Sequence, residues 1–83
     1  MKDYVEIVKI QKKGGYKLLF YFNDSSKRLI DFSEFLNKSV GVFSIIKNKN
    51  EFTKFKIDMA GGISWECGAD LCAEALIDKN RFN

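Results

Sequence analysis

The stretch at residues 16–22, which reads YKLLFYF, decides the fold because it is the clearest β-strand of the sequence. Side chains alternate between the two faces of a strand, so every second residue shares a face. One face carries Tyr16, Leu18, Phe20 and Phe22, and the other carries Lys17, Leu19 and Tyr21. Since the second face is also partly apolar, we expect this strand at the centre of a sheet rather than at its edge.

Turn signals on both sides of this strand predict a three-strand antiparallel meander. Gly14 and Gly15 precede it, and a run of Asn, Asp and Ser at residues 23–26 follows it. Residues 4–11, rich in Val and Ile, predict the first strand, and residues 27–31 predict the third. The first strand is terminal in the meander and mixes charges with apolar residues, so we expect it to be a free edge.

The middle of the sequence predicts short helices. Asp31 and Glu34 have the spacing of a capping box, in which an acceptor side chain is followed three residues later by a glutamate. This box predicts a helix over residues 32–37, and single helical turns are expected over residues 42–47 and 51–54. The apolar residues of these turns are expected to fill the core, namely Val42, Phe43, Ile45, Ile46 and Phe52.

Two further strands, over residues 55–59 and 63–65, predict a C-terminal hairpin. A two-residue loop would place apolar side chains opposite polar ones, whereas a three-residue loop over residues 60–62 keeps one face apolar. We therefore expect the longer loop, with a glycine in the left-handed region. The pairs that it predicts are Met59 opposite Ile63 and Ile57 opposite Trp65, with Trp65 in the core.

The last part of the sequence predicts a closing helix. Residues 68–70 are expected to leave the sheet, and residues 73–79 to form a short helix capped by Asp70 or Cys72. Lys79 would lie in its last turn, where a cation suits the helix dipole. Residues 1–83 thus predict a single small α+β domain, whose antiparallel sheet combines the meander with the hairpin and is accompanied by short helices.

The composition is that of one small globular domain. Hydrophobic residues make up 46% of the 83 residues and charged residues 30%, a balance that excludes a disordered tail. No apolar run approaches the roughly 18 residues of a membrane span, and no secretory signal follows Met1. Because no export signal accompanies Cys67 and Cys72, we expect free thiols in a reducing cytoplasm, and no membrane partner.

One run of the sequence, DMAGGISWECGADL at residues 58–71, resembles the signature of a bacterial family of unknown function, number 2442. That signature has an Asp, a glycine turn, an apolar residue near a Trp, and then Gly-x-Asp-[Ile/Leu]. Further pieces resemble the family in the same order, namely Phe22 to Asp24, Asp31 with Phe32, Gly41 to Phe43, and Leu76. Ser25 departs from it, since the family usually has a turn glycine there. The resemblance implies a small bacterial α+β domain and brings no activity or catalytic residue with it.

The absence of histidine narrows the chemistry that the chain can perform. It removes the usual general base near neutral pH and most zinc sites. Cys67 and Cys72 have four residues between them, which is not the spacing of a Cys-x-x-Cys redox motif. We therefore expect no enzymatic activity, no catalytic residue, no cofactor and no metal site.

Two groups of residues are candidates for binding. The first is a basic cluster on the meander, represented by Lys12, Lys17 and Tyr21, because lysines beside exposed aromatic rings can hold single-stranded nucleic acid. The cluster also includes Lys9, Lys13, Lys27 and Arg28, beside Tyr4 and Tyr16. Such lysines can equally protect a strand edge from aggregation. The second group is Asp58 and Asp70, which are either turn and cap acceptors or a ligand-binding carboxylate pair.

These observations favour a non-enzymatic binding or accessory module that docks on another bacterial protein, with an antitoxin-like role among the options. Its partner would be another protein or a second copy, bound through the edge strand at residues 4–11. The alternative is a nucleic-acid-binding domain that uses the basic strands at the N-terminal side.

Overall fold

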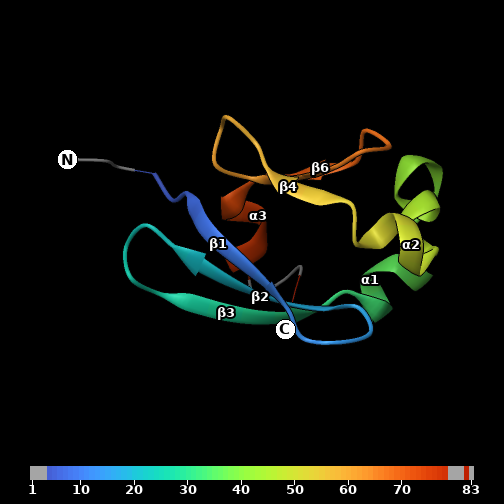
Figure 1. Cartoon of the computed structure of the whole chain (residues 1–83), viewed down its shortest axis with the longest axis horizontal. Helices are drawn as coiled ribbons and strands as arrows, with labels where there is room; N and C mark the ends of the chain where they lie inside the picture. Colours follow the sequence, from blue (N-terminus) through green and yellow to red (C-terminus); the bar gives the residue numbers. More distant parts are fainter. Residues whose placement is uncertain (1–3, 79–81, 83) are drawn as a thin grey trace.

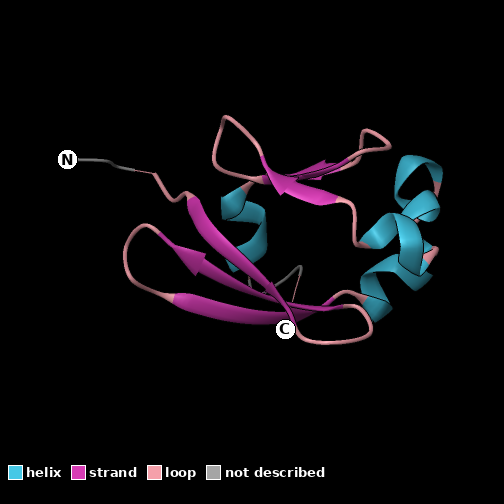
Figure 2. Ribbon diagram, in the orientation of Figure 1, coloured by secondary structure: helices cyan, strands magenta, loops and turns pink. Residues whose placement is uncertain are grey.

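The computed structural model of the protein describes residues 4–78 and 82. They form two three-stranded antiparallel sheets accompanied by short helices, an α+β arrangement (Figure 1, Figure 2). The first sheet contains β1 (Ile7–Lys12), β2 (Lys17–Phe22) and β3 (Lys27–Asp31), in that order. The predicted meander is therefore confirmed, and β2 is its central strand.

The alternation of β2 sorts its side chains as predicted. Leu18, Phe20 and Phe22 are buried on the inner face, where Ile30 of β3 lies opposite Leu18. The turn from β2 to β3 places Ser25 at φ +72°, in the left-handed region that glycine favours. A glycine at this position would adopt the same conformation without strain.

The helix α1 (Ser33–Asn37) begins without the predicted capping box. Its N-cap is Phe32, whose side chain makes no capping bond. Asp31 lies one residue earlier, and its Oδ1 accepts hydrogen bonds from the Ser33 N–H at 2.9 Å and the Ser33 hydroxyl at 2.6 Å. Glu34 pairs with Lys38 at 3.3 Å on the exposed side of the helix. The Asp31 carboxylate therefore supports the turn into the helix through Ser33.

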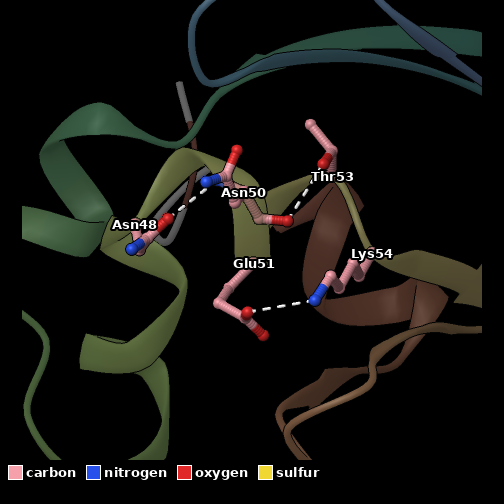
Figure 3. A network of polar contacts seen from close by, with 5 residues as sticks. All are labelled: Asn48, Asn50, Glu51, Thr53 and Lys54. Carbon is pink, nitrogen blue, oxygen red and sulfur yellow. Dashed lines mark hydrogen bonds and ion pairs between the residues drawn. The ribbon is translucent and has the colours of Figure 1, made fainter.

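The two helical turns that follow are η1 (Gly41–Lys47), a 3-10 helix, and α2 (Lys49–Phe52). The Asn48 side chain accepts a hydrogen bond from the Asn50 N–H at 2.9 Å, and Lys54 pairs with Glu51 at 3.2 Å (Figure 3). The prediction that all their apolar residues fill the core is wrong in part. Ile46 and Phe52 are buried and Phe43 packs against the core, but Val42 and Ile45 are exposed.

The second sheet begins with β4 (Phe55–Ile57) and β5 (Ile63–Trp65), shorter than predicted and paired in a different register. Ile57 lies opposite Ile63 and Phe55 opposite Trp65, which is a shift of two residues from the expected pairs. The shift preserves the apolar face, since alternation has a period of two. Met59 leaves the sheet entirely and is fully exposed at the tip of the loop.

The Asp58 side chain explains this register. Its Oδ1 accepts hydrogen bonds from the Ala60 N–H at 2.9 Å and the Gly62 N–H at 3.0 Å, so the loop closes around the carboxylate. The Asp58 N–H also donates to the Gly62 carbonyl at 2.9 Å. The three loop residues are thus 59–61 rather than 60–62, and Gly61 takes the expected left-handed conformation at φ +86°.

The prediction that residues 68–70 leave the sheet is wrong. The two residues of β6 (Asp70–Leu71) complete the second sheet, with Asp70 opposite Ser64 of β5. The closing helix is α3 (Ala73–Ile77), and its N-cap is Cys72 with no side-chain hydrogen bond. Asp70 therefore does not cap it, and Lys79 lies outside the described residues. Within the described ranges, no helix has the length and apolar character needed to cross a bilayer.

The two sheets share one aromatic core. The ring of Phe32 lies at its centre and contacts rings from both halves of the chain, namely those of Phe20, Phe35, Phe52, Trp65 and Phe82. Trp65 is 3% exposed, which confirms its predicted place in the core. The sheets also meet through the backbone, where the Ile7 N–H of β1 donates to the Gly61 carbonyl at 2.8 Å.

Candidate interaction surface on the first sheet

The outward-facing side of the first sheet, called the outer face below, carries Leu19 and Leu29 across its middle, called the apolar row below. The strand register aligns Gln11 of β1 with Leu19 of β2 and Leu29 of β3. Leu29 is 52% exposed, and Gln11 and Leu19 are half-buried. Two leucines therefore lie side by side on the solvent side of the sheet.

A basic row lies on each side of this apolar row. One aligns Lys9, Tyr21 and Lys27. The other aligns Lys17 with Asp31, and the Lys13 N–H bonds the Lys17 carbonyl at 3.0 Å, which continues the row onto the β1 side. The two rows together carry four lysines and one carboxylate, so the apolar row lies in a field of positive charge.

Tyr21 is held in place on the outer face by its neighbours in β1. The Lys9 Nζ lies 5.4 Å from the centroid of the Tyr21 ring, a distance at which a cation is attracted to an aromatic face. The Tyr21 hydroxyl donates to the Gln11 Oε1 at 3.0 Å. The outer face therefore presents an ordered ring beside the two leucines.

The single carboxylate of the outer face is held by hydrogen bonds. The Ser33 hydroxyl, followed by the Ser33 N–H, lowers the pKa of the Asp31 carboxyl from its ordinary value, and the charge of Lys17 contributes in the same direction. The Asp31 carboxylate is thus already engaged with its own chain. The outer face therefore carries four lysine charges against one ionised carboxylate, and its balance of charge is positive.

The structure divides the predicted basic cluster between different surfaces. Lys17 and Tyr21 lie on the outer face. Lys12 is exposed at the end of β1 and lies opposite Leu18, so it belongs to the other face of the sheet. Tyr16 packs edge-on against Phe52, with ring centroids 5.1 Å apart, and its hydroxyl donates to the Lys47 carbonyl. Arg28 donates to backbone carbonyls in the last part of the chain, those of Ile77 and Phe82.

The second predicted group, Asp58 and Asp70, lies on the second sheet. The hydrogen bonds of Asp58 to its own loop support its interpretation as a turn acceptor. Asp70 is exposed in β6. Among residues 4–78 and 82, no group of three or more His, Cys, Asp or Glu side chains could hold a metal ion. Cys67, half-buried, and Cys72, exposed, are both free thiols.

The residues that the sequence reasoning missed on this surface are Leu19 and Leu29. In the sequence, Leu19 indicates only that β2 is central, and no local pattern distinguishes Leu29. The signal that would indicate them is the length of the β2–β3 loop, because a three-residue loop over residues 23–25 pairs Phe22 with Ser26 and sets Leu19 opposite Leu29.

Comparison with known proteins gives a family and no closer relative. No curated protein and no solved structure matches the chain. The model of one family, described as protein of unknown function (DUF2442), matches residues 7–82, a range that includes the whole outer face. Because this match covers nearly the whole chain, the protein belongs to the DUF2442 family.

Proposed function

We propose that the protein is a non-enzymatic binding module of the bacterial cytoplasm, which docks on a partner protein through the outer face of its first sheet. The observation that carries the proposal is the apolar pair of Leu19 and Leu29, aligned with Gln11 and lying between two basic rows. The solvent face of an antiparallel sheet is ordinarily polar. Covering exposed leucines there with another protein surface is favourable, because it removes apolar area from water.

The pattern of the outer face is that of a protein interface. Such interfaces combine an apolar or aromatic centre, which is fully buried on binding, with a polar rim. Leu19, Leu29 and Tyr21 supply the centre, and the lysines supply the rim. Because the rim is positive, the complementary surface carries Asp and Glu around an apolar centre.

Nucleic acid is the alternative, and the position of Tyr21 between Lys9 and Lys27 is the observation in its favour. Stacking of successive bases needs several free aromatic faces. The outer face offers one ring, which Lys9 already approaches, and Tyr16 is turned toward Phe52 instead. Leucines in the remaining central positions suit a protein surface better than bases.

A matched pair of threonine substitutions tests the proposal. Leu29→Thr shortens the apolar row at an exposed position and places there a β-branched residue, which suits a strand. Val40→Thr is the control, because Val40 is 85% exposed and belongs to the segment between α1 and η1. The tagged wild type and both variants are used to capture partners from native cytoplasm, after thermal melts have shown that all three are folded.

The expected result is that a protein retained by the wild type and by Val40→Thr is lost with Leu29→Thr and with the double variant Lys9→Glu, Lys27→Glu. Retention of the same proteins by every variant contradicts docking through this face. Binding to single- or double-stranded DNA probes, with an affinity that falls log-linearly with salt, would support the nucleic-acid alternative instead.

A further inference from the structure

The outer edge of β1 has a hydrogen-bonding pattern that can be derived from its pairing with β2. The Lys13 N–H donates to the Lys17 carbonyl at 3.0 Å, and bonded and non-bonded pairs alternate along an antiparallel ladder. Lys9 and Gln11 therefore direct their backbone groups toward β2. Ile10 and Lys12, at the alternate positions, direct theirs away from the sheet.

This edge is closed at one end and open at the other. At the start of β1, the Ile7 N–H donates to the Gly61 carbonyl of the second sheet. Beyond this contact β1 and β4 belong to separate sheets and diverge, as Figure 1 shows. In the described part of the chain, no strand pairs with the outer edge of β1, and no residue accepts a hydrogen bond from the Ile10 or Lys12 N–H.

We infer that an extended, acidic segment of a partner protein adds to this edge as a further strand. The inference rests on the proposed function in taking the partner to be a protein, and it specifies the chemistry of the segment. Unpaired backbone groups of an edge strand supply the affinity in such additions. The charges supply the selectivity, because residues 7–13 contain Lys9, Lys12 and Lys13 and no acidic residue.

The same charges disfavour a second copy as the occupant. Pairing of β1 with β1 of another molecule brings two positively charged strands together, with Lys9 opposite Lys13 where Ile10 pairs with Lys12, and like charges on neighbouring strands are destabilising. The other borders are less suitable for an acidic strand. β3 carries Asp31 beside its basic residues, and β4 and β6 contain three and two residues.

The two sides of the edge define the pattern of the segment. Ile10 is half-buried and faces the inner side of the sheet, so the residue of the partner segment that lies beside it is apolar. Lys9 and Lys13 belong to the basic rows of the outer face, so the residues beside them are Asp or Glu. The partner segment therefore alternates apolar and acidic residues.

Amide exchange with water, measured by NMR at pH 7, tests the inference directly. The probe is a capped seven-residue peptide of alternating valine and glutamate, and its counterpart has lysine in place of glutamate. We expect the acidic peptide to slow exchange at the Ile10 and Lys12 amides, about tenfold at a peptide concentration nine times Kd. The Lys9 and Gln11 amides, already bonded to β2, keep their rates.

Two variants separate the backbone contribution from the charge. Lys12→Pro removes an outward N–H, which an edge strand tolerates, and is expected to weaken peptide binding. Lys12→Ala removes the same charge, keeps the N–H and is expected to bind more tightly than Lys12→Pro. An acidic peptide that is N-methylated on alternate residues is expected not to bind, and this control holds even if Lys12→Pro does not fold.

Three outcomes overturn the inference. One is an unchanged exchange rate at Ile10 and Lys12 with the acidic peptide at millimolar concentration. Another is equal slowing by the lysine peptide, and the third is slowing that depends on protein concentration without peptide, which indicates a second copy. The proposed function fails separately, because Leu29→Thr tests native partner capture and lies on β3, away from the β1 edge.

Discussion

The indole Nε1 of Trp65 donates a hydrogen bond of 2.8 Å to the backbone carbonyl of Phe52. The bond joins β5 to the end of α2, and both residues are buried in the aromatic core. Trp65 thus fills space and also satisfies a carbonyl at the end of a helix, where intrahelical partners run out.

We expect Trp65→Phe to destabilise the fold less than Trp65→Ala, because phenylalanine removes mainly the hydrogen bond whereas alanine also removes the packing. Phenylalanine keeps much of the packing but leaves the Phe52 carbonyl without its partner, which costs about 1–3 kcal/mol. Alanine also opens a cavity, at a total cost of about 3–5 kcal/mol. Urea denaturation followed by circular dichroism measures both. Equal stabilities of Trp65→Phe and wild type would mean that the hydrogen bond contributes nothing net.

Three glycines form a series that separates backbone strain from steric overlap. At Gly68 the φ of +105° is unfavourable for alanine, but a Cβ meets nothing within 4 Å. At Gly62 a Cβ would lie 2.5 Å from the Leu71 carbonyl oxygen. At Gly61 both problems occur together, since φ is +86° and a Cβ would lie 2.6 Å from the Glu6 Cγ.

For alanine at each position, we therefore expect the largest loss of unfolding free energy at Gly61. Gly68→Ala is expected to cost about 1–2 kcal/mol from strain alone. Gly61→Ala adds displacement of the segment before β1 from the β4–β5 loop, and with it the Ile7–Gly61 hydrogen bond. Thermal melts of the three variants give the order. A Gly61→Ala variant no less stable than Gly68→Ala would contradict the close approach of Glu6.

The lowered pKa of Asp31 makes a pH-dependent contribution to stability. A carboxyl with a lower pKa in the folded state stabilises the fold above its unfolded pKa, near 3.9, and loses that contribution as pH falls through the folded value. Asp31→Asn keeps an acceptor oxygen but does not titrate. The difference in unfolding free energy between wild type and Asp31→Asn is expected to be constant above about pH 5 and to shrink below pH 4.

Ser33→Ala is the control for this prediction, because the Ser33 hydroxyl is the main cause of the lowered pKa. In a Ser33→Ala background, Asp31→Asn is expected to change the acid limb of the stability curve less. Urea midpoints between pH 2.5 and pH 7 give the comparison. An unchanged effect of Asp31→Asn in that background would assign the pH dependence to another contact.

The two thiols are expected to react at different rates in the folded protein. Cys72 is exposed at the start of α3, whereas Cys67 is half-buried, with its Sγ 4.0 Å from the Val42 carbonyl. A thiol-specific reagent should therefore modify Cys72 first, and reductant should leave the melting temperature unchanged. Equal rates for the two thiols, together with a slower rate for Cys72 in Cys67→Ser, would instead indicate that the thiols interact.

The first sheet could be predicted because its side chains alternate strongly. The apolar positions 18, 20 and 22 determine which face of β2 is buried, and the flanking turns then determine the order of the strands. The second sheet has weaker signals. β6 contains two residues, too few to show a period, and the β4–β5 register depends on the Asp58 hydrogen bonds rather than on apolar pairing.

The candidate surface was predicted in part for a similar reason. Residue types identified the basic strands, but only the register of β1, β2 and β3 shows which lysines share a face with Leu19 and Leu29. Tyr16 and Arg28 looked equivalent to Tyr21 and Lys17 in sequence. Their partners, the Lys47 carbonyl and the carbonyls near residue 82, are distant in the chain, so no local pattern indicated them.

The burial of Phe82 has a consequence for biosynthesis. Its ring centroid lies 5.2 Å from that of Phe32 and 5.2 Å from that of Phe35. Since residue 82 is synthesised after every strand of both sheets, the core is completed only when this ring docks on Phe32. Until that contact forms, the Phe32 ring stays partly uncovered, and apolar surface exposed during folding favours aggregation.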